Sequence, residues 1–327
     1  MLNVRKYFVI SIYFLTFANV IQSGIVPHNN NKLKQNRVMK EKLMTKAEFV
    51  EFNTEMSRLK NIKWKSYTAT LKEVGVTYLG KVAQSAKMLH SYEHKFSTYC
   101  LYLAAADLSG FNVCPKNDMC KANCLMGSGR NKVSRLSGRD DIDGSRITKT
   151  RLFFANREVF MRLMLHEIKL EKKRAKLKGH EFSVRINGTS DLNPTLFKLG
   201  EKNILQMFPN VMFYDYTKVP NYLELLKEYP NYDITWSIDG SKNNFKIGMD
   251  YLKEGGRIAV VFGTETMPKT FMGYKVIDGD KYDARYKDDN VVVGLKFKTT
   301  ATNFKKGKFV MPNSEFIVKE GDIRCKW

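Results

Sequence analysis

Several familiar catalytic signatures are missing from this chain of 327 residues. It has no HExxH pair of zinc ligands, no Walker A phosphate loop and no GxSxG nucleophile turn. These absences count against zincin, P-loop and α/β-hydrolase chemistry. Cysteine is scarce, and an odd number of 5 residues does not fit a disulfide framework. The longest apolar run near the N-terminus falls short of the roughly 20 residues that a bilayer needs, so we expect no stable membrane span.

Acidic residues are also in short supply. Lys and Arg number 55 against 33 Asp and Glu, a net charge of +22. An excess of this size would attract nucleic acid, other polyanions or an anionic membrane surface. The basic residues are spread along the whole chain, however, which favours a solvated surface over a dedicated nucleic-acid face.

The first 44 residues carry a hydrophobic leader and a polar linker. A basic pair precedes the apolar run 7–17 and small residues follow it, which is the layout of a secretory signal and predicts a secreted protein. A mis-assigned start is the alternative, with Met39 or Met44 as the true first residue. The clustered cysteines favour the reducing cytoplasm that this alternative implies.

Three of the five cysteines, Cys114, Cys120 and Cys124, lie within eleven residues. Thiolates are preferred ligands of iron–sulfur clusters and of zinc. A structural metal site closes with four protein ligands, whereas a reactive one leaves a position open. Three clustered thiols without a fourth beside them therefore predict an open metal site. The blander alternatives are buried thiols or a structural zinc with Cys100, Cys325 or a histidine as the fourth ligand.

Hydrophobic periodicity predicts an α/β protein. Residues 45–95 read as a helical lead-in, 96–106 as a buried strand, and 146–178 as one long helix after a flexible segment 127–143. A helix from about Asp118 would place Cys120 and Cys124 on one face. Strands and helices then alternate, which is typical of a parallel sheet. The predicted strands are 181–186, 211–216, 233–238 and 257–262, and the predicted helices are 194–208, 221–229 and 245–254.

We therefore expect a partial (β/α) barrel of parallel strands over residues 96–263. A β-rich extension follows over 264–327, with strands at 275–277 and 291–298. The polar loop between these two strands is rich in aspartate. It could bind a divalent cation through oxygen ligands, but its spacing is not that of an EF-hand and favours a hydrophilic hairpin. Its aspartates are Asp278, Asp280, Asp283, Asp288 and Asp289.

Ligands in parallel α/β folds bind at the carboxyl ends of the strands. Each predicted strand ends in small, polar or charged residues, so these ends are candidates to line one pocket around the metal. Asp191 could instead cap a following helix, and Ser237 and Asp239 could be ordinary turn residues. The candidates are Asn187, Ser190, Asp191, Asp215, Lys218, Ser237 and Asp239.

Several stretches resemble a known family in their order along the chain. The segments CPKNDMCKANCL, VRINGTSDL, FPNVMFYDYTK and VIDGDKYDARY, followed by VVVGLKFK, resemble the phage "gene product eighty-eight" domain family over residues 95–309. The likeness implies a phage protein acting in the host cytoplasm. It implies no particular activity.

A looser resemblance is to the radical S-adenosylmethionine enzymes. In these, a partial barrel carries three cysteines in the loop after its first strand, where they hold a 4Fe-4S cluster. The resemblance implies Cys114, Cys120 and Cys124 as cluster ligands. The spacing here is wider than usual, and Asn123 replaces the aromatic residue that often precedes the last cysteine.

Two hypotheses follow. In the first, the chain is a radical enzyme acting on a nucleic acid or nucleotide. Asp215 and Lys218 would then be catalytic groups on the substrate side. S-adenosyl-L-methionine would bind through Asn187, Ser190 and Asp191 at its amino-acid end and through Ser237 or Asp239 at its ribose. In the second, the chain is a basic, non-enzymatic nucleic-acid-associated protein with a structural zinc or iron–sulfur site.

Overall fold

The structure is a computed structural model that describes residues 44–139, 141–300, 303–305, 308–312 and 314–327. Residues 46–327 form one compact unit. The predicted leader lies almost entirely outside the described residues, so its interpretation stays a prediction. Among the described helices, none combines the length and apolar character needed to cross a membrane.

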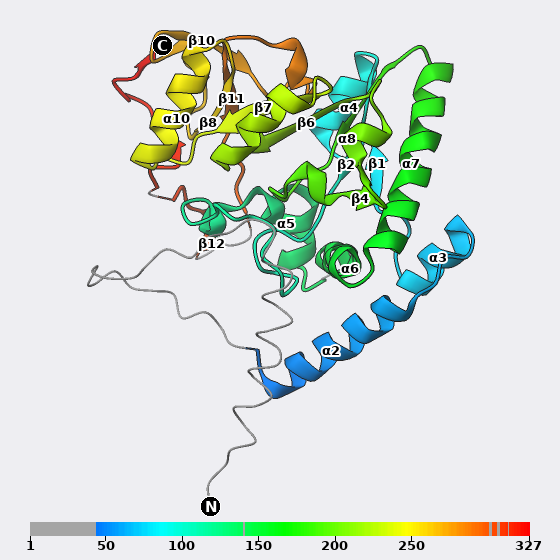
Figure 1. Ribbon diagram of the computed structural model, residues 1–327. Coiled ribbons are helices and arrows are strands. Elements are labelled where there is room, and N and C mark those ends of the chain that lie inside the picture. Colours follow the sequence, from blue (N-terminus) through cyan, green and yellow to red (C-terminus); the bar gives the residue numbers. More distant parts are fainter. Residues whose placement is uncertain (1–43, 140, 301–302, 306–307, 313) are drawn as a thin grey trace, which may run out of the picture. The chain divides into compact units, whose positions relative to one another are not determined.

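A mostly parallel sheet of 11 strands is the framework of this unit (Figure 1). Its central strands lie side by side in the order in which they occur along the chain, as expected from the alternation of strands and helices. These strands are β2 (Phe96–Leu101), β3 (Glu181–Arg185), β6 (Met212–Thr217), β7 (Tyr232–Ser237), β8 (Ile258–Phe262) and β11 (Val292–Lys296).

Further strands extend the sheet at both edges, and one pairs with β8 inside it. The described strands follow an open path from β1 to β15, and a closed barrel is not formed by them. The lead-in and the C-terminal extension both contribute strands, so the boundaries expected at residues 95 and 264 run through a single sheet. The added strands are β1 (Gly80–Val82), β9 (Thr270–Phe271), β10 (Tyr274–Asp278), β14 (Ile317–Val318) and β15 (Cys325–Lys326).

Most helices flank the sheet. Successive side chains of each strand point to opposite faces of the sheet. Helices α7 and α10 pack on one face, over the buried side chains of two hydrophobic clusters. The helices are α2 (Lys46–Asn61), α3 (Tyr67–Val74), α4 (Ala86–Glu93), α5 (Gly129–Leu136), α6 (Asp141–Ala155), α7 (Arg157–Leu177), α8 (Ile204–Met207), α9 (Leu225–Glu228) and α10 (Lys242–Lys253).

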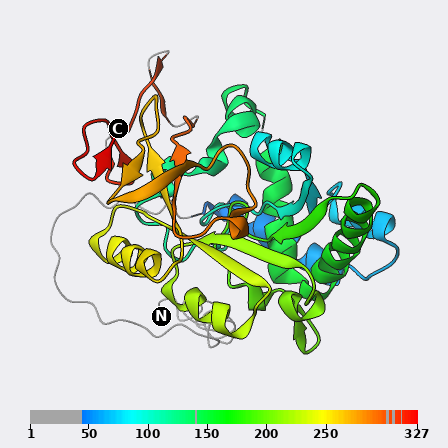
Figure 2. The same ribbon diagram turned by 90° about the horizontal axis from the view of Figure 1, so that it is seen from above.

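The opposite face of β2, β3 and β6, here called the inner face, is polar. Helix α4 and the segment 282–288 cover it, and Figure 2 shows the orange segment after β10 on the side of the strands away from α7 and α10. The inner-face side chains are Thr98, Cys100, Ser183, Arg185, Tyr214 and Tyr216.

Several of the predicted elements are wrong. The lead-in is not purely helical, because residues 80–82 form β1 beside β2. The long helix 146–178 is two helices that meet at Asn156. The Asn156 side chain accepts from Val159 N at 3.2 Å and donates to the carbonyls of residues 59, 60 and 62, so contacts distant in sequence fix the break.

The cysteine segment departs from prediction as well. No α-helix starts near Asp118, and two 3₁₀ turns, η1 (Lys121–Asn123) and η2 (Leu125–Gly127), stand there instead. The segment expected to be flexible contains α5. Cys120 and Cys124 are therefore not presented on one face of a helix.

The last misread stretch is 194–208. It holds a 3₁₀ turn η3 (Pro194–Leu196), the hairpin of β4 (Lys198–Leu199) and β5 (Lys202–Asn203), and only then α8. Gly200 lies at φ +60°, a left-handed conformation that ends any helix and makes the hairpin turn possible.

Candidate metal centre

The cysteine loop is tied to the loop that follows β3. Asp191 N donates to Val113 O at 2.8 Å, which fixes the residue just before Cys114. Ala106 N donates to the Cys114 sulfur at 3.4 Å, and that sulfur lies 3.8 Å from Thr189 O. Because β2 and β3 are parallel neighbours, these bonds hold Cys114 at the carboxyl edge of the sheet, where a ligand site was expected.

The three thiols are half-buried, and they interact electrostatically with one another. Burial raises the pKa of Cys114 to about 12 and also raises the pKa of Cys124, with the charge of Cys120 contributing to both shifts. Thiolate is the form that binds metals, so an ion would have to displace these protons. The described residues contain no group of three His, Cys, Asp or Glu side chains already in ligating positions. The donor set suits a thiolate-bound metal, but the sulfurs would have to turn toward it.

Lys218 joins the cysteines to the other predicted site residues. Burial by itself would lower the pKa of Lys218, but electrostatic interaction with Cys120, Asp191, Asp239 and Cys114 raises it above its ordinary value. Predicted candidates from three other strand ends therefore act on the half-buried Lys218. This convergence was expected from the rule that parallel strands gather their carboxyl ends at one edge.

Asp191 is bound within the protein and does not cap a helix. Its carboxylate accepts from the Thr217 hydroxyl at 2.7 Å and from Lys218 N at 3.0 Å. The cap of the following 3₁₀ turn is Asn193, which accepts from Thr195 N at 2.9 Å. Asp191 thus fixes the start of the loop after β6, and through it the position of Lys218.

Asn187 and Ser190 form the interior of the same loop. The Asn187 amide donates to Leu192 O and to Asp215, and its oxygen accepts from Leu192 N and from the Ser190 hydroxyl, over 2.7–3.0 Å. All four hydrogen-bonding positions of the amide are therefore used. Asn187 positions the loop and has no bond left for a ligand.

Asp215 lies beneath this loop and is 1% exposed. Burial raises its pKa to about 7, although Asn187 N donates to it at 2.8 Å. Its carboxyl group lies on the face of the sheet that α7 and α10 cover, where Tyr232 also approaches it. The position supports a role in shaping the site more than direct contact with a substrate.

A pH experiment tests the placement of Asp215. A raised pKa means that the folded state holds a proton which the unfolded chain releases near pH 4, so stability falls as the pH rises toward 7 and then levels off. Between pH 5 and pH 7.5 the free energy of unfolding should fall by about 2 kcal/mol more in the wild type than in Asp215→Asn. Urea unfolding at both pH values measures it, and parallel slopes for the two proteins would contradict the placement.

Ser237 and Asp239 lie at the end of β7. Asp239 is buried, accepts from Ser241 N at 2.9 Å and donates through its own N to the Asn244 side chain. Ser237 is half-buried, and its carbonyl accepts from Asn244 at 3.0 Å. Both residues therefore shape the turn into α10, while the charge of Asp239 acts on Lys218.

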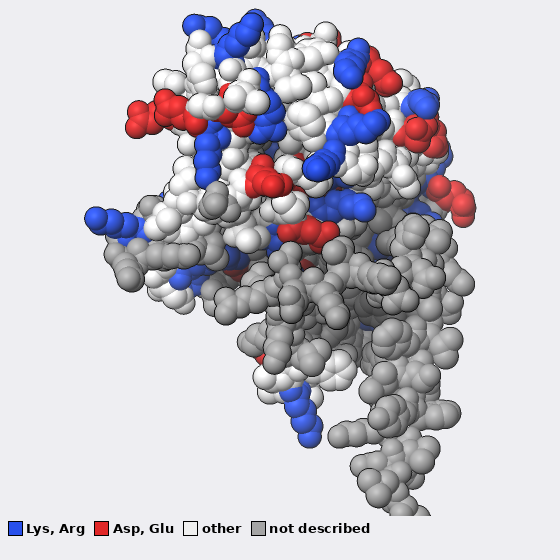
Figure 3. All heavy atoms as spheres, turned by 90° about the vertical axis from the view of Figure 1, so that its left-hand side faces the viewer, with Lys and Arg blue, Asp and Glu red and all other residues white. Residues whose placement is uncertain are grey.

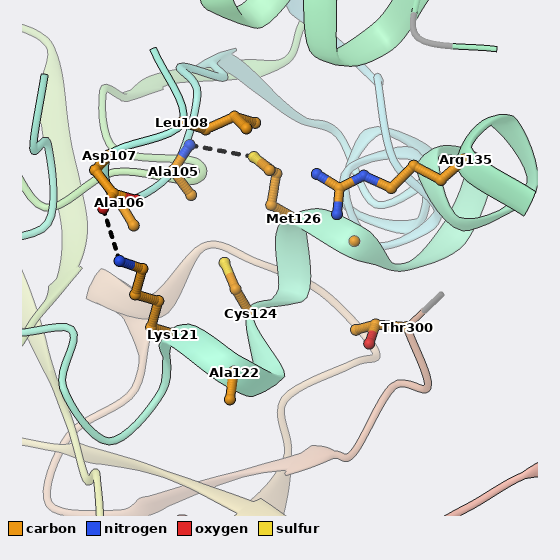
Figure 4. Close-up of a pocket in the computed structure, with 11 residues that line it drawn as sticks. Ala105, Ala106, Asp107, Leu108, Lys121, Ala122, Cys124, Met126, Arg135 and Thr300 are labelled. Atoms are coloured by element: carbon orange, nitrogen blue, oxygen red, sulfur yellow. Dashed lines mark hydrogen bonds and ion pairs between the residues drawn. The ribbon is translucent and has the colours of Figure 1, made fainter. Parts of the chain in front are cut away.

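A cavity of about 150 Å³ opens beside the cysteines. Figure 4 shows the Cys124 sulfur facing this space, between the Lys121–Asp107 ion pair and Met126. Arg135, which is paired with Asp143, closes another side. Of the three clustered cysteines, Cys124 is the one that lines the cavity.

Cys100 and Cys325, the two cysteines outside the loop, lie in different surroundings. Cys325 is in β15 and packs against the hydrophobic cluster around Trp236 and Leu252, whereas Cys114 packs against the cluster around α7. Cys100 is fully buried within β2, on the inner face. Neither is placed beside the cysteine loop by the contacts described.

The inner face carries a charged group, separate from the one around Lys218, that was not predicted from the sequence. Asp283, from the aspartate-rich loop, is paired with Lys87 and Arg185. The hydrophilic hairpin expected at this loop is wrong, because β10 and β11 pair in parallel. Asp280 is likewise paired with Lys298 and Asp288 with Arg285. The only sequence feature that could have indicated this charged group is the place of Asp283 in the DGDKYDARY stretch.

The surface charge does not gather into one basic patch on the face that Figure 3 shows. Lys and Arg side chains there are interspersed with Asp and Glu. On this face the arrangement agrees with the solvated surface expected from the even spread of lysines.

These features define an α/β protein whose parallel strands carry a cysteine loop, a lysine and two carboxylates at their carboxyl edge. The chain matches the family described as Gene product 88 over residues 68–310 and belongs to it, which confirms the first resemblance. The matched region contains the cysteine loop and Asp283 but not Cys325. Comparisons with curated proteins and with solved structures give no match, and none of them supports the likeness to radical S-adenosylmethionine enzymes.

Proposed function

We propose that this chain is an iron–sulfur enzyme that works by radical S-adenosylmethionine chemistry on an anionic substrate, such as a nucleotide or a nucleic acid. The observation that carries the proposal is the convergence of Cys114, Cys120 and Cys124 with Lys218 at the carboxyl edge of the sheet. The sequential order of the parallel strands supports a partial barrel around that edge.

The three cysteines would hold the cluster. A 4Fe-4S cluster bound by three thiolates supplies an electron and leaves one iron free for the cofactor. Lys218 would balance the negative charge that gathers there, and its amine forms no hydrogen bond or ion pair among the contacts described. Asp191 and Asn187 would position the loop, leaving Lys218, Ser190, Ser237 and Asp239 as candidate contacts to the cofactor or substrate.

Anaerobic purification and reconstitution with iron and sulfide test the proposal. We expect a brown protein with about four irons per chain that cleaves S-adenosyl-L-methionine when reduced. Replacing any one of Cys114, Cys120 or Cys124 by Ser should abolish cluster assembly, because three thiolates are the minimum that can hold the cluster with one open iron.

Cys325→Ser is the matched control. Cys325 is also half-buried but packs against a different hydrophobic cluster, so its replacement should leave iron content and absorption unchanged. A colourless protein that holds one zinc per chain, and loses it in Cys325→Ser, would overturn the proposal in favour of a structural site.

A further inference from the structure

The inner face of the sheet holds an ion group with more positive than negative charge. Asp283 is 0% exposed and lies 2.5 Å from Lys87 Nζ and 3.0 Å from Arg185 Nη1. The Tyr214 hydroxyl donates to the same carboxylate at 3.0 Å. The Asp283 carboxylate thus pairs with two cations, Lys87 and Arg185. The nearby Arg285 is left out of this group because it is paired with Asp288.

Tyr216 contacts both basic side chains, which are partly exposed. Lys87 Nζ donates to the Tyr216 hydroxyl at 2.9 Å, and the Arg185 guanidinium lies 4.5 Å from the centre of the Tyr216 ring. Their side chains remain 13% and 14% exposed, whereas Asp283 is sealed beneath them. Asp283 is therefore closed to solvent, whereas the two basic side chains keep part of their surface exposed.

This group lies toward the functional edge of the sheet. Arg185 is the last residue of β3, and its partner in register is Cys100 of β2, the strand that leads into the cysteine loop. Tyr216 is the next-to-last residue of β6, directly before Thr217 and Lys218. A molecule resting on these side chains would lie on the inner face, near the strand ends that carry the candidate metal centre.

We propose that Lys87, Arg185 and Tyr216 form a binding site for the phosphate group of the substrate. An unbalanced charge in a half-buried position is unfavourable until an anion offsets it. A guanidinium fixed against an aromatic ring beside an ammonium and a hydroxyl matches the several acceptor oxygens of a phosphate. The identity of the bound phosphate as part of a substrate rests on the proposed function. The binding site itself needs no metal.

Titration of the metal-free protein with inorganic phosphate, at constant ionic strength, tests the site by calorimetry and thermal unfolding. Arg185→Gln and Lys87→Gln should each weaken phosphate binding about tenfold or more, and each leaves Asp283 one cation. Asp283→Asn should strengthen binding, because it frees both cations. Sodium acetate separates the two anion sources: binding of acetate as tight as that of phosphate would reassign the site to carboxylates and overturn the proposal.

Lys246→Gln is the control, because Lys246 is an exposed lysine of α10 paired with Asp250. It should bind phosphate like the wild type. Equal phosphate affinity in Lys246→Gln, Lys87→Gln and Arg185→Gln would identify general attraction to a basic surface and overturn the proposal. Weaker binding in Asp283→Asn would also overturn it. Since cluster assembly is absent from these measurements, a failure here is distinct from a failure of the metal proposal.

Discussion

Replacing Glu167 by Ala is expected to lower the free energy of unfolding by about 3 to 5 kcal/mol, the cost of breaking a buried charged network. The Glu167 carboxylate is 4% exposed and accepts four hydrogen bonds. The hydroxyls of Tyr67 and Tyr99 donate at 2.9 and 2.6 Å, and Leu79 N and Gly80 N at 2.8 and 2.9 Å. Removing the carboxylate leaves four donors without this acceptor, and three of them are buried.

The Glu167 bonds join distant parts of the chain. Helix α7 supplies the carboxylate, while α3, β1 and β2 supply the donors, so this residue docks the lead-in on the sheet. Glu167→Gln should cost about 2 kcal/mol, because an amide has one acceptor oxygen and would turn its NH₂ toward other donors.

Glu158→Ala on the same helix is the control for Glu167. Glu158 is exposed and pairs with Arg162 at 2.9 Å, a surface ion pair whose loss should cost less than about 1 kcal/mol. Urea unfolding of the three variants and the wild type measures the differences. Glu167→Ala as stable as Glu158→Ala would show that the lead-in is not held by this carboxylate.

The strands could be predicted from sequence because parallel strands buried on both sides read as short, continuous apolar runs. β8, with the sequence IAVVF, is such a run. The positions at which helices are interrupted were harder to predict from the sequence. Asn156 ends one helix and starts the next by bonding to carbonyls 94 to 97 residues earlier, and no local pattern contains that information. The hairpin at Gly200 was likewise hidden within a stretch of helical appearance.

The candidate metal centre was predictable for a similar reason. The residues that follow parallel strands meet at one edge whatever the loops do, so Asp191, Lys218 and Asp239 could be grouped in advance. The inner face could not. Lys87 and Asp283 come from elements outside the alternating pattern, and Asp283 binds Ser91, which lies 192 residues away. Only the folded sheet brings these charges together.

Asp283→Ala is expected to destabilise the protein by about 3 to 5 kcal/mol, since it leaves Lys87 and Arg185 without their shared carboxylate. Burial would raise the pKa of Asp283, but these two cations hold it well below its ordinary value. A depressed pKa in the folded state gives stability that is fully present above the unfolded pKa of about 4 and is lost as the pH falls below it. The difference between wild type and Asp283→Asn should therefore be largest near pH 7 and shrink toward pH 3.

Asp250→Asn provides the comparison for Asp283, because Asp250 is an exposed partner of Lys246 at 2.8 Å and its loss should change stability by less than about 1 kcal/mol. If Asp283→Ala unfolds at the same urea concentration as Asp250→Asn, the inner-face ion group does not stabilise the fold. If Asp283→Ala is strongly destabilised, added phosphate should restore part of the loss, because an anion bound to Lys87 and Arg185 replaces the missing charge. The same two cations would then stabilise the fold through Asp283 and hold the substrate through the part of them that reaches the surface.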